Sequence, residues 1–319
     1  MKTLLPSLVV CASLIMGPAA WADSKPVDSK PQDIVIGLLT AESQWLPQAS
    51  KIAAKLDHEN GLRVVPMLGV GGLQVYQDMI SLPNVDAAIL SSDSLTYAAS
   101  QNLLGVGQDK FTYVARLATL DVVLITKHSI GNVTALAGKR IATGPAQSAA
   151  FATGELLFNA LGLPFTRVAK QDDAAIDALA NGEADAALIL GTDISTAALS
   201  DGRFHVLSLQ IPSALSNIYQ PAILTSRELP GLVTQKQSVE TLATSLTLAV
   251  LDHPRDPQHM KALQNFEAMM FKLSASDAGG NLAAAVPGWK RHAEAQKILE
   301  QTQSSLINNA TITPTGGQP

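Results

Sequence analysis

The chain has 319 residues and a formal net charge of −5, and 47% of its residues are hydrophobic whereas only 15% are charged. This composition provides enough core for two lobes, and the lack of any basic run argues against nucleic acid and anionic membrane surfaces as partners. Aromatic residues make up 4% of the chain, which disfavours a sugar site built from stacked rings.

The first 22 residues have the pattern of a secretory signal peptide. Lys2 gives a positive start, residues 4–16 form an apolar stretch too short to span a bilayer, and a small-x-small cleavage sequence ends at Ala22. We expect cleavage after Ala22 and a periplasmic mature protein. It would be stable without disulfides, because Cys11 is the only cysteine. A lipid anchor on Cys11 is the weaker alternative, since too little apolar sequence precedes it.

Strands and helices alternate over the next part of the chain. Apolar runs predict strands at residues 34–43, 62–68 and 85–93. Two helices are predicted between them, with inward faces formed by Ala49, Ile52, Ala53 and Leu56 and by Leu73, Tyr76 and Ile80. A βαβαβ order predicts a parallel sheet, because each connecting helix must cover a sheet face.

The same order returns about a hundred residues later in the chain. The predicted strands are residues 140–143, 165–170 and 184–193, and the predicted helices are residues 150–161 and 172–182. The two units end alike, in DAAIL-SSD and DAALILGTD. We therefore expect an α/β fold with two lobes, each a mostly parallel sheet flanked by helices.

Two crossings between the lobes are expected to form a hinge. The strand at residues 121–126 is long and apolar enough for the first, and the second is expected near residues 217–226. The predicted division is a signal peptide (1–22), lobe I (23–118 with 222–319) and lobe II (119–221). Near the C-terminus a helical stripe of Leu263, Phe266, Met269, Met270 and Leu273 predicts core packing against the first lobe.

Ligands of open α/β sheets bind beyond the carboxyl ends of the strands. The corresponding loops are residues 38–44, 69–72, 91–94, 144–149 and 191–195. They contain few charges and offer N–H groups and hydroxyls, which suit oriented binding more than bond-breaking. The fourth loop leads into a helix and is a potential anion cradle, although most such junctions hold water or a capping side chain.

The candidate ligand contacts come from these loops and from two aromatic residues. They are Thr40, Glu42, Trp45, Gly71, Ser91, Ser92, Asp93, Pro145, Gln147, Ser148, Thr192, Asp193 and Tyr219. Capping of the following helix is the other expected role of Ser92 or Asp93, and core packing is the alternative for Trp45 and Tyr219. Arg116 is the candidate buried cation, with a structural salt bridge as an equal alternative.

Patterns for catalysis or metal binding do not accompany these residues. The histidines are scattered, and His253 and His259 flank a segment, PRDPQ, that suits a surface turn better than a metal site. Ser91 lacks a Gly-x-Ser-x-Gly elbow and a placed histidine. We expect no enzymatic activity, no metal and no cofactor.

Three segments carry a resemblance to a known family. They are AAILSSDSLTYA (87–98), LAGKRIATGPAQSAAFATGELLFNALGL (136–163) and ALANGEADAALILGTD (178–193). Their order resembles the TAXI-type extracytoplasmic solute receptors of tripartite (TRAP) transporters and, more broadly, type II periplasmic binding proteins. The resemblance implies a two-lobed type II fold with a two-strand hinge. It further implies a monomer that captures a small molecule and meets membrane permease subunits.

The chain departs from the family pattern in its loops. The first loop carries Glu42 and Trp45 where the family has glycines, and no arginine follows the GPAQSAAF loop. These departures disfavour a small acidic ligand and favour a neutral, more apolar one. The alternative is a periplasmic interaction, accessory or sensory protein of the same fold with a modified or lost ligand site.

Overall fold

The computed structural model describes residues 33–195, 197–199, 201–252, 256–273, 277 and 280–311. The predicted signal peptide, its cleavage site and His253 therefore lie outside the described residues. Within the described ranges, no helix combines the length and the apolar character that a membrane span requires.

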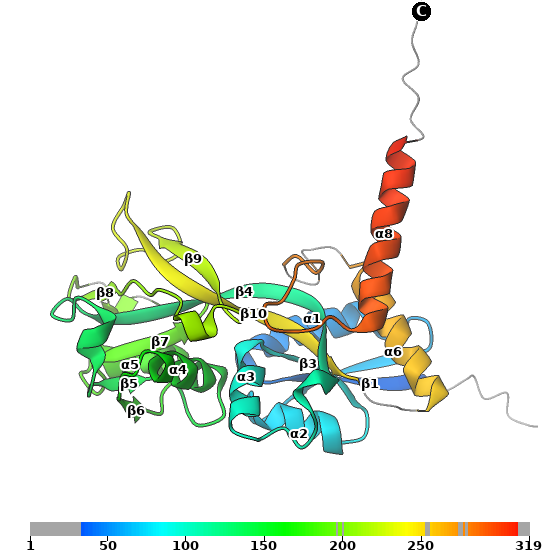
Figure 1. Cartoon of the computed structure of the whole chain (residues 1–319), viewed down its shortest axis with the longest axis horizontal. Helices are drawn as coiled ribbons and strands as arrows, with labels where there is room; N and C mark the ends of the chain where they lie inside the picture. Colours follow the sequence, from blue (N-terminus) through cyan, green and yellow to red (C-terminus); the bar gives the residue numbers. More distant parts are fainter. Residues whose placement is uncertain are drawn as a thin grey trace, which may run out of the picture. The chain divides into compact units, whose positions relative to one another are not determined.

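The first predicted βαβαβ unit is confirmed (Figure 1). It consists of β1 (Ile34–Thr40), α1 (Leu46–Leu56), β2 (Leu62–Leu68), α2 (Gln74–Ser81) and β3 (Val85–Ser91), and α3 (Asp93–Ser100) follows it. The strands are parallel in the order β2-β1-β3. The four predicted inward positions of α1 are all buried, and Pro47 stands in its first turn, where a missing N–H costs no helix hydrogen bond.

The second predicted unit is confirmed as well. It consists of β5 (Arg140–Ala142), α4 (Ala149–Ala160), β6 (Thr166–Val168), α5 (Asp172–Ala180) and β7 (Ala186–Leu190). Its parallel strands have the order β6-β5-β7, which repeats the order of the first unit. We call the two units the first repeat and the second repeat.

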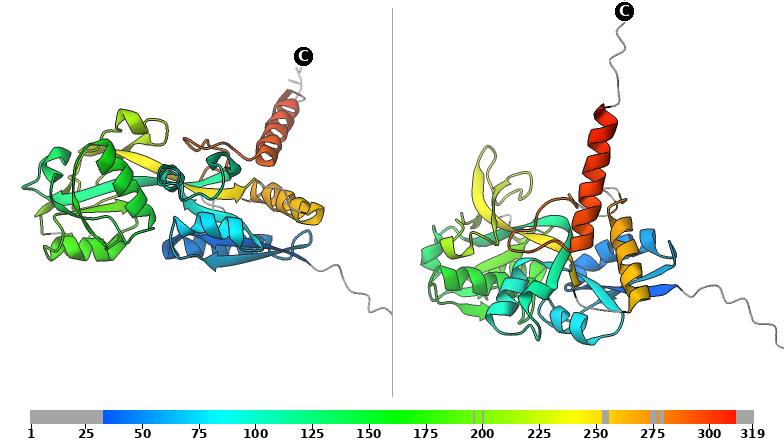
Figure 2. Two further views of the ribbon diagram at one scale, coloured as in Figure 1. Left: turned by 60° about the horizontal axis from the view of Figure 1, so that its bottom comes forward. Right: turned by 45° about the vertical axis from the view of Figure 1, so that its right-hand side comes forward.

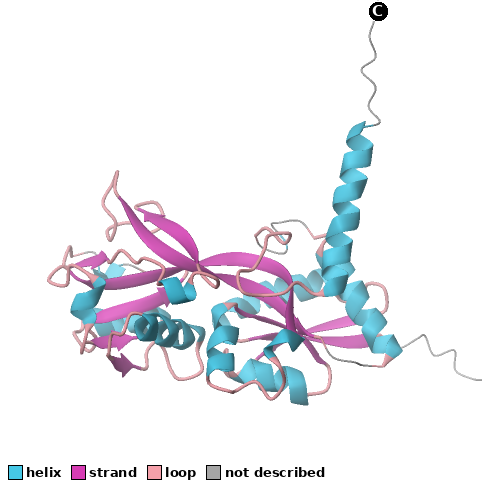
Figure 3. Ribbon diagram, viewed as in Figure 1, coloured by secondary structure: helices cyan, strands magenta, loops and turns pink. Residues whose placement is uncertain are grey.

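Two long antiparallel strands connect the repeats, β4 (Phe111–Lys127) and β10 (Ser238–Leu251). β10 pairs with β3 and β4, and β4 pairs with β7, which gives a mixed sheet in the order β2-β1-β3-β10-β4-β7-β5-β6. Figure 3 shows long strands running between the two groups of helices. The predicted strand at residues 121–126 thus lies within β4. The first repeat borders β10, which is antiparallel to β3, and the second repeat borders β4, which is antiparallel to β7.

The return strand differs from the prediction. Residues 217–226 contain β9 (Gln220–Thr225), which pairs with β10, whereas β10 itself leads back to β3. The sequence pattern concealed β10 because Thr241, Thr244 and Ser245 interrupt its apolar run. These hydroxyl side chains are nevertheless buried.

The remaining elements pack around the two repeats and the long strands. They are β8 (Phe204–Val206), α6 (Pro257–Met270), α8 (Ala293–Thr311) and the short 3-10 turns η1 (Ser43–Trp45), η2 (Gln108–Lys110), η3 (Val133–Leu136), η4 (Ala197–Leu199) and η5 (Ser213–Leu215). β8 pairs with β4, and α6 packs against β1 and α1 (Figure 2). Four residues of the predicted stripe on α6 are buried, and Leu273 is partly buried beside them.

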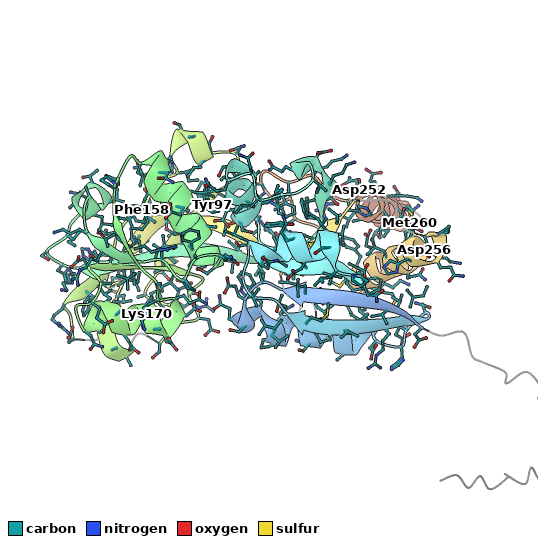
Figure 4. The ribbon with its side chains drawn as sticks, turned by 90° about the horizontal axis from the view of Figure 1, so that it is seen from below. Tyr97, Phe158, Lys170, Asp252, Asp256 and Met260 are labelled. Atoms are coloured by element: carbon teal, nitrogen blue, oxygen red, sulfur yellow. The ribbon has the colours of Figure 1, made fainter. Side chains whose placement is uncertain are left out.

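The main hydrophobic core includes residues of both repeats. Tyr97 of α3 packs edge-to-face on Phe151 of α4, with ring centroids 5.4 Å apart. Figure 4 shows Tyr97 next to α4, the helix that also carries Phe158. The two repeats are therefore in direct contact, and the start of α4 faces the loops of the first repeat.

Candidate functional site

A small cavity lies where three of the predicted loops meet. Its volume is about 190 Å³, and its walls come from the loops after β1, β2 and β5 and from Gln171 after β6. The lining residues are Ala41, Glu42, Ser43, Leu68, Gly69, Val70, Gly71, Pro145, Ala146, Ser148 and Gln171. These loops follow the carboxyl ends of parallel strands, which is where open α/β sheets bind ligands.

Two larger cavities lie elsewhere. One of about 360 Å³ is bounded by β9, β10 and residues 209–211, and one of about 320 Å³ lies beside α3 and the loop that follows it. Neither is lined by any predicted ligand contact. We take the smaller cavity as the candidate site, because polar groups of both repeats converge on it.

Glu42 bridges the two repeats at this cavity. Its Oε1 accepts a hydrogen bond from the Ala149 backbone N–H at 2.8 Å, and its Oε2 accepts one from Gln171 Nε2 at 3.2 Å. Ala149 is the first residue of α4, so the carboxylate lies at the positive end of the helix dipole. The predicted anion cradle therefore holds a carboxylate of the chain itself.

The environment of Glu42 acts on its charge in two directions. Only 7% of the residue is exposed, and this burial raises the pKa of Glu42 above its ordinary value. The hydrogen bonds from Ala149 and Gln171 oppose the rise in pKa, while the nearby Asp172 carboxyl adds to it. No lysine or arginine is among the residues that line the cavity.

The loop before α4 is fixed by contacts of its backbone and by one cap. Ser148 Oγ accepts a hydrogen bond from Phe151 N at 3.1 Å and so caps the helix. Gln147 has an exposed side chain and a φ of 78°, and its carbonyl oxygen accepts a hydrogen bond from Leu73 N at 3.2 Å. A backbone contact therefore joins this loop to the first repeat.

Gly71 permits this close approach. Its φ is +129°, a conformation that side chains rarely adopt, and a Cβ at this position would lie 2.9 Å from the Gln147 carbonyl oxygen. Glycine is thus required both for the turn after β2 and for its contact with the loop before α4.

Asp93 makes a second contact with α4. Its Oδ2 accepts hydrogen bonds from Thr153 Oγ1 at 2.5 Å and from the Tyr219 hydroxyl at 2.8 Å. The residue is completely buried, and burial raises the pKa of the Asp93 carboxyl and that of the Tyr219 hydroxyl. We call Asp93, Thr153 and Tyr219 the Asp93 cluster.

The predicted side-chain cap of α3 is wrong. The helix begins at Asp93, but neither Ser92 nor Asp93 accepts a capping hydrogen bond. Ser92 Oγ instead forms a hydrogen bond of 2.9 Å with Thr244 Oγ1 of β10, and Trp289 Nε1 donates to the Ser92 carbonyl oxygen at 2.7 Å. The hydroxyl is directed to the buried central strand because that strand supplies a polar partner there.

The other predicted contacts lie away from the cavity lining. Ser91 and Thr40 are buried, and Thr40 Oγ1 donates to the Met67 carbonyl oxygen at 3.3 Å. Trp45 belongs to the hydrophobic core, as its alternative interpretation stated. Thr192 and Asp193 follow β7 and do not line the cavity.

Arg116, His259 and His292 have structural partners. Arg116 is half-buried in β4, where its Nη1 donates to Gln220 Oε1 at 3.3 Å. His259 Nε2 pairs with Asp86, and His292 Nδ1 lies 2.8 Å from Glu267 Oε1. Across the part of the chain that the structure describes, His, Cys, Asp and Glu side chains nowhere gather into a group of three that could hold a metal.

Two residues at the contact between the repeats were not predicted. Gln171 follows β6, so the same strand-end rule that selected the loop after β2 would have selected it in the second repeat. Thr153 lies one helical turn after Ala149, and its pattern does not distinguish it from other buried positions of α4.

Comparisons with known proteins identify the fold. No family model matches the chain, and no curated protein sequence matches it. Its structure is similar to that of XAC2383 from Xanthomonas citri bound to ATP, with a TM-score of 0.50 and 9% identity over 88% of this chain and 99% of that chain. It is also similar to PhnD1 from Prochlorococcus marinus in complex with methylphosphonate, with a TM-score of 0.51 and 10% identity over 87% and 99% of the two chains.

A third match is the periplasmic aliphatic sulphonate binding protein SsuA from Escherichia coli, with a TM-score of 0.44 and 14% identity over 89% and 95% of the two chains. At these identities the similarity concerns the fold. The chain shares with XAC2383 and PhnD1 an α/β fold with a mixed sheet and flanking helices, and the α/β class is the one that the sequence predicted.

Proposed function

We propose that this protein is a periplasmic solute-binding protein that captures a small molecule between two lobes and delivers it to a TAXI-type TRAP transporter. The convergence of loops from both repeats on one cavity carries this proposal. In it, each repeat forms the centre of one lobe, and β4 and β10 form the hinge. The ligand would stabilise the closed arrangement because it contacts both lobes only there.

The lining of the cavity favours a neutral or basic solute with an apolar part. Glu42 and the nearby Asp172 place two carboxyl groups at the site, and no basic side chain is among the lining residues. Leu68 and Val70, which also line the cavity, are 51% and 79% exposed. They provide apolar surface for a ligand whose polar end donates a hydrogen bond to Glu42.

The size of the cavity means that a drug-sized ligand would bind only if the lobes separate. Drug-sized ligands occupy pockets of roughly 300–1,000 Å³, and this cavity has about 190 Å³. A rotation about β4 and β10 would open it. A very small solute would fit without that motion.

A second candidate function is that of an interaction, accessory or sensory protein with a modified ligand site. The occupation of the α4 start by Glu42 favours it, since the chain itself satisfies those donors. In that case the contact surface would be the outside of the lobes, and no solute would bind with high affinity.

Thermal unfolding with a panel of small molecules separates the two functions. A neutral or basic solute at about 100 times its Kd should stabilise the fold by about 2.7 kcal/mol, and Val70→Trp should abolish the shift by blocking the cavity. Val106→Trp is the matched control, because Val106 is also exposed but lines a different cavity. If no amine, amino acid, neutral metabolite or acid shifts the melting temperature, the solute-binding function is wrong.

A further inference from the structure

Glu42 differs from an ordinary surface carboxylate in its partners. Its two oxygens each accept one N–H hydrogen bond, from Ala149 and from Gln171, and both donors belong to the second repeat. Glu42 itself belongs to the loop after β1, 107 residues before Ala149. The contact is therefore an interaction between repeats.

The two donors that face Glu42 are uncharged N–H groups, so the carboxylate is held by hydrogen bonds and not by a salt bridge. The N-terminus of α4 directs an N–H group and the positive end of its dipole to Oε1. The Gln171 amide directs a second N–H group to Oε2. Ser148 Oγ caps the Phe151 N–H, so the first N–H of the helix is left for Glu42.

We propose that Glu42 is a tethered ligand: its carboxylate occupies the position that an anionic group of a solute would take at the start of α4, holds the repeats together and excludes anions. This inference goes beyond the proposed function and applies to either candidate function. Removal of the carboxylate would vacate two aligned donors and leave the rest of the cradle in place.

The exclusion has two physical causes. The Glu42 carboxylate fills the position between the two donors, so a second anion would have to displace it. A displaced Glu42 would remain close to the incoming anion and repel it, and Asp172 would add to the repulsion. A neutral group does not need the two donors that Glu42 occupies, and the carboxylates do not repel it.

The chain offers a direct test by chemical rescue. Glu42→Ala removes a CH₂–COO⁻ fragment, which acetate matches in size and charge. We expect the variant of the full chain to melt about 2–4 °C below the wild type, and 100 mM sodium acetate should restore most of that loss. Sodium chloride at the same ionic strength should not.

Glu59→Ala is the matched control, because Glu59 is an exposed glutamate in the turn before β2. Acetate should leave the melting temperatures of this variant and of the wild type unchanged relative to chloride. In ¹⁵N spectra of Glu42→Ala, the Ala149 amide signal should move during the acetate titration. Equal acetate effects on Glu42→Ala and Glu59→Ala, or an unmoved Ala149 signal, would overturn the proposal.

Glu42→Gln serves if Glu42→Ala does not fold. The amide keeps an acceptor for the Ala149 N–H but removes the charge and fills the acetate position. We expect an intermediate melting temperature and no acetate rescue, and rescue of this variant would contradict the proposal. A failed solute panel leaves these outcomes unchanged, so failure of the proposed function and failure of the tethered ligand are distinguishable.

Discussion

Glu42 and Asp93 occupy similar positions in the chain, each just after a strand of the first repeat, but their carboxylates have different roles. Both follow strands of the first repeat and both contact α4 in the second. Glu42 meets a backbone N–H at the edge of a cavity, whereas Asp93 meets hydroxyls in a fully buried cluster. The comparison indicates that the Glu42 contact, which lies at the cavity, can be replaced by a small molecule, whereas the buried Asp93 contact is structural.

The largest expected difference between the two carboxylates is in stability. Asp93→Ala should lower the free energy of unfolding by about 3 kcal/mol, because it leaves the buried Tyr219 hydroxyl without its acceptor and leaves Thr153 Oγ1 with only the Ala149 carbonyl oxygen. Glu42→Ala should cost about 1 kcal/mol, since water can reach the donors that it leaves. Urea unfolding of both variants measures the difference, and a larger loss for Glu42→Ala would reverse the comparison.

Gly71 tests the Glu42 side of the contact without changing a carboxylate. Gly71→Ala should cost about 2 kcal/mol, because it combines an unfavourable φ with a Cβ 2.9 Å from the Gln147 carbonyl oxygen. Gly138→Ala is the control: its φ is +72° and no atom lies within 4 Å of the added Cβ, so about 1 kcal/mol is expected. Similar losses in urea unfolding would show that the close approach contributes nothing.

The pH dependence of stability sharpens the comparison further. Burial raises the pKa of both Glu42 and Asp93 in the folded state, so the folded protein binds these protons more tightly than the unfolded chain. Stability from each group should therefore increase as the pH falls from its raised folded-state pKa towards the ordinary value of 4.5 for Glu42 and 3.8 for Asp93. It should decrease again as the pH rises through that folded-state pKa.

Glu42→Gln and Asp93→Asn remove these contributions one at a time. Each unit by which a folded-state pKa is raised corresponds to about 1.4 kcal/mol. Unfolding measured from pH 7 down towards the ordinary pKa values of the two groups should show the wild type gaining stability relative to each variant. A wild type that loses stability relative to both variants on acidification would contradict the direction of both pKa shifts.

The sequence predicted the elements whose apolar positions are regular. The spacing of Ala49, Ile52, Ala53 and Leu56 identified α1, and the recurring strand and helix order identified both repeats. It did not identify β10, because buried hydroxyls such as that of Thr244 look like surface residues in a hydropathy pattern. The hydroxyls of Thr241 and Thr244 are accommodated by partners in other elements, and sequence periodicity does not contain such pairings.

The site was predicted at the level of loops and only partly at the level of contacts. The strand-end rule located Glu42, Gly71 and Ser148 at one cavity. It did not indicate that Glu42 would reach the amide of Ala149, because the direction of a side chain depends on how the repeats pack. Asp93 was selected for its place after β3, whereas its partner Thr153 could be found only from the fold.

The place of β10 in the sheet has a consequence for how the chain folds. This strand is the last of the ten in sequence, and it lies between β3 and β4. β3 and β4 can pair with β10 only after residues more than a hundred positions beyond β4 have been synthesised. The β3–β10 and β4–β10 pairings therefore close long loops and are intrinsically slow to form. A chaperone that binds the incompletely folded chain would therefore be expected to bind the unpaired edges of β3 and β4.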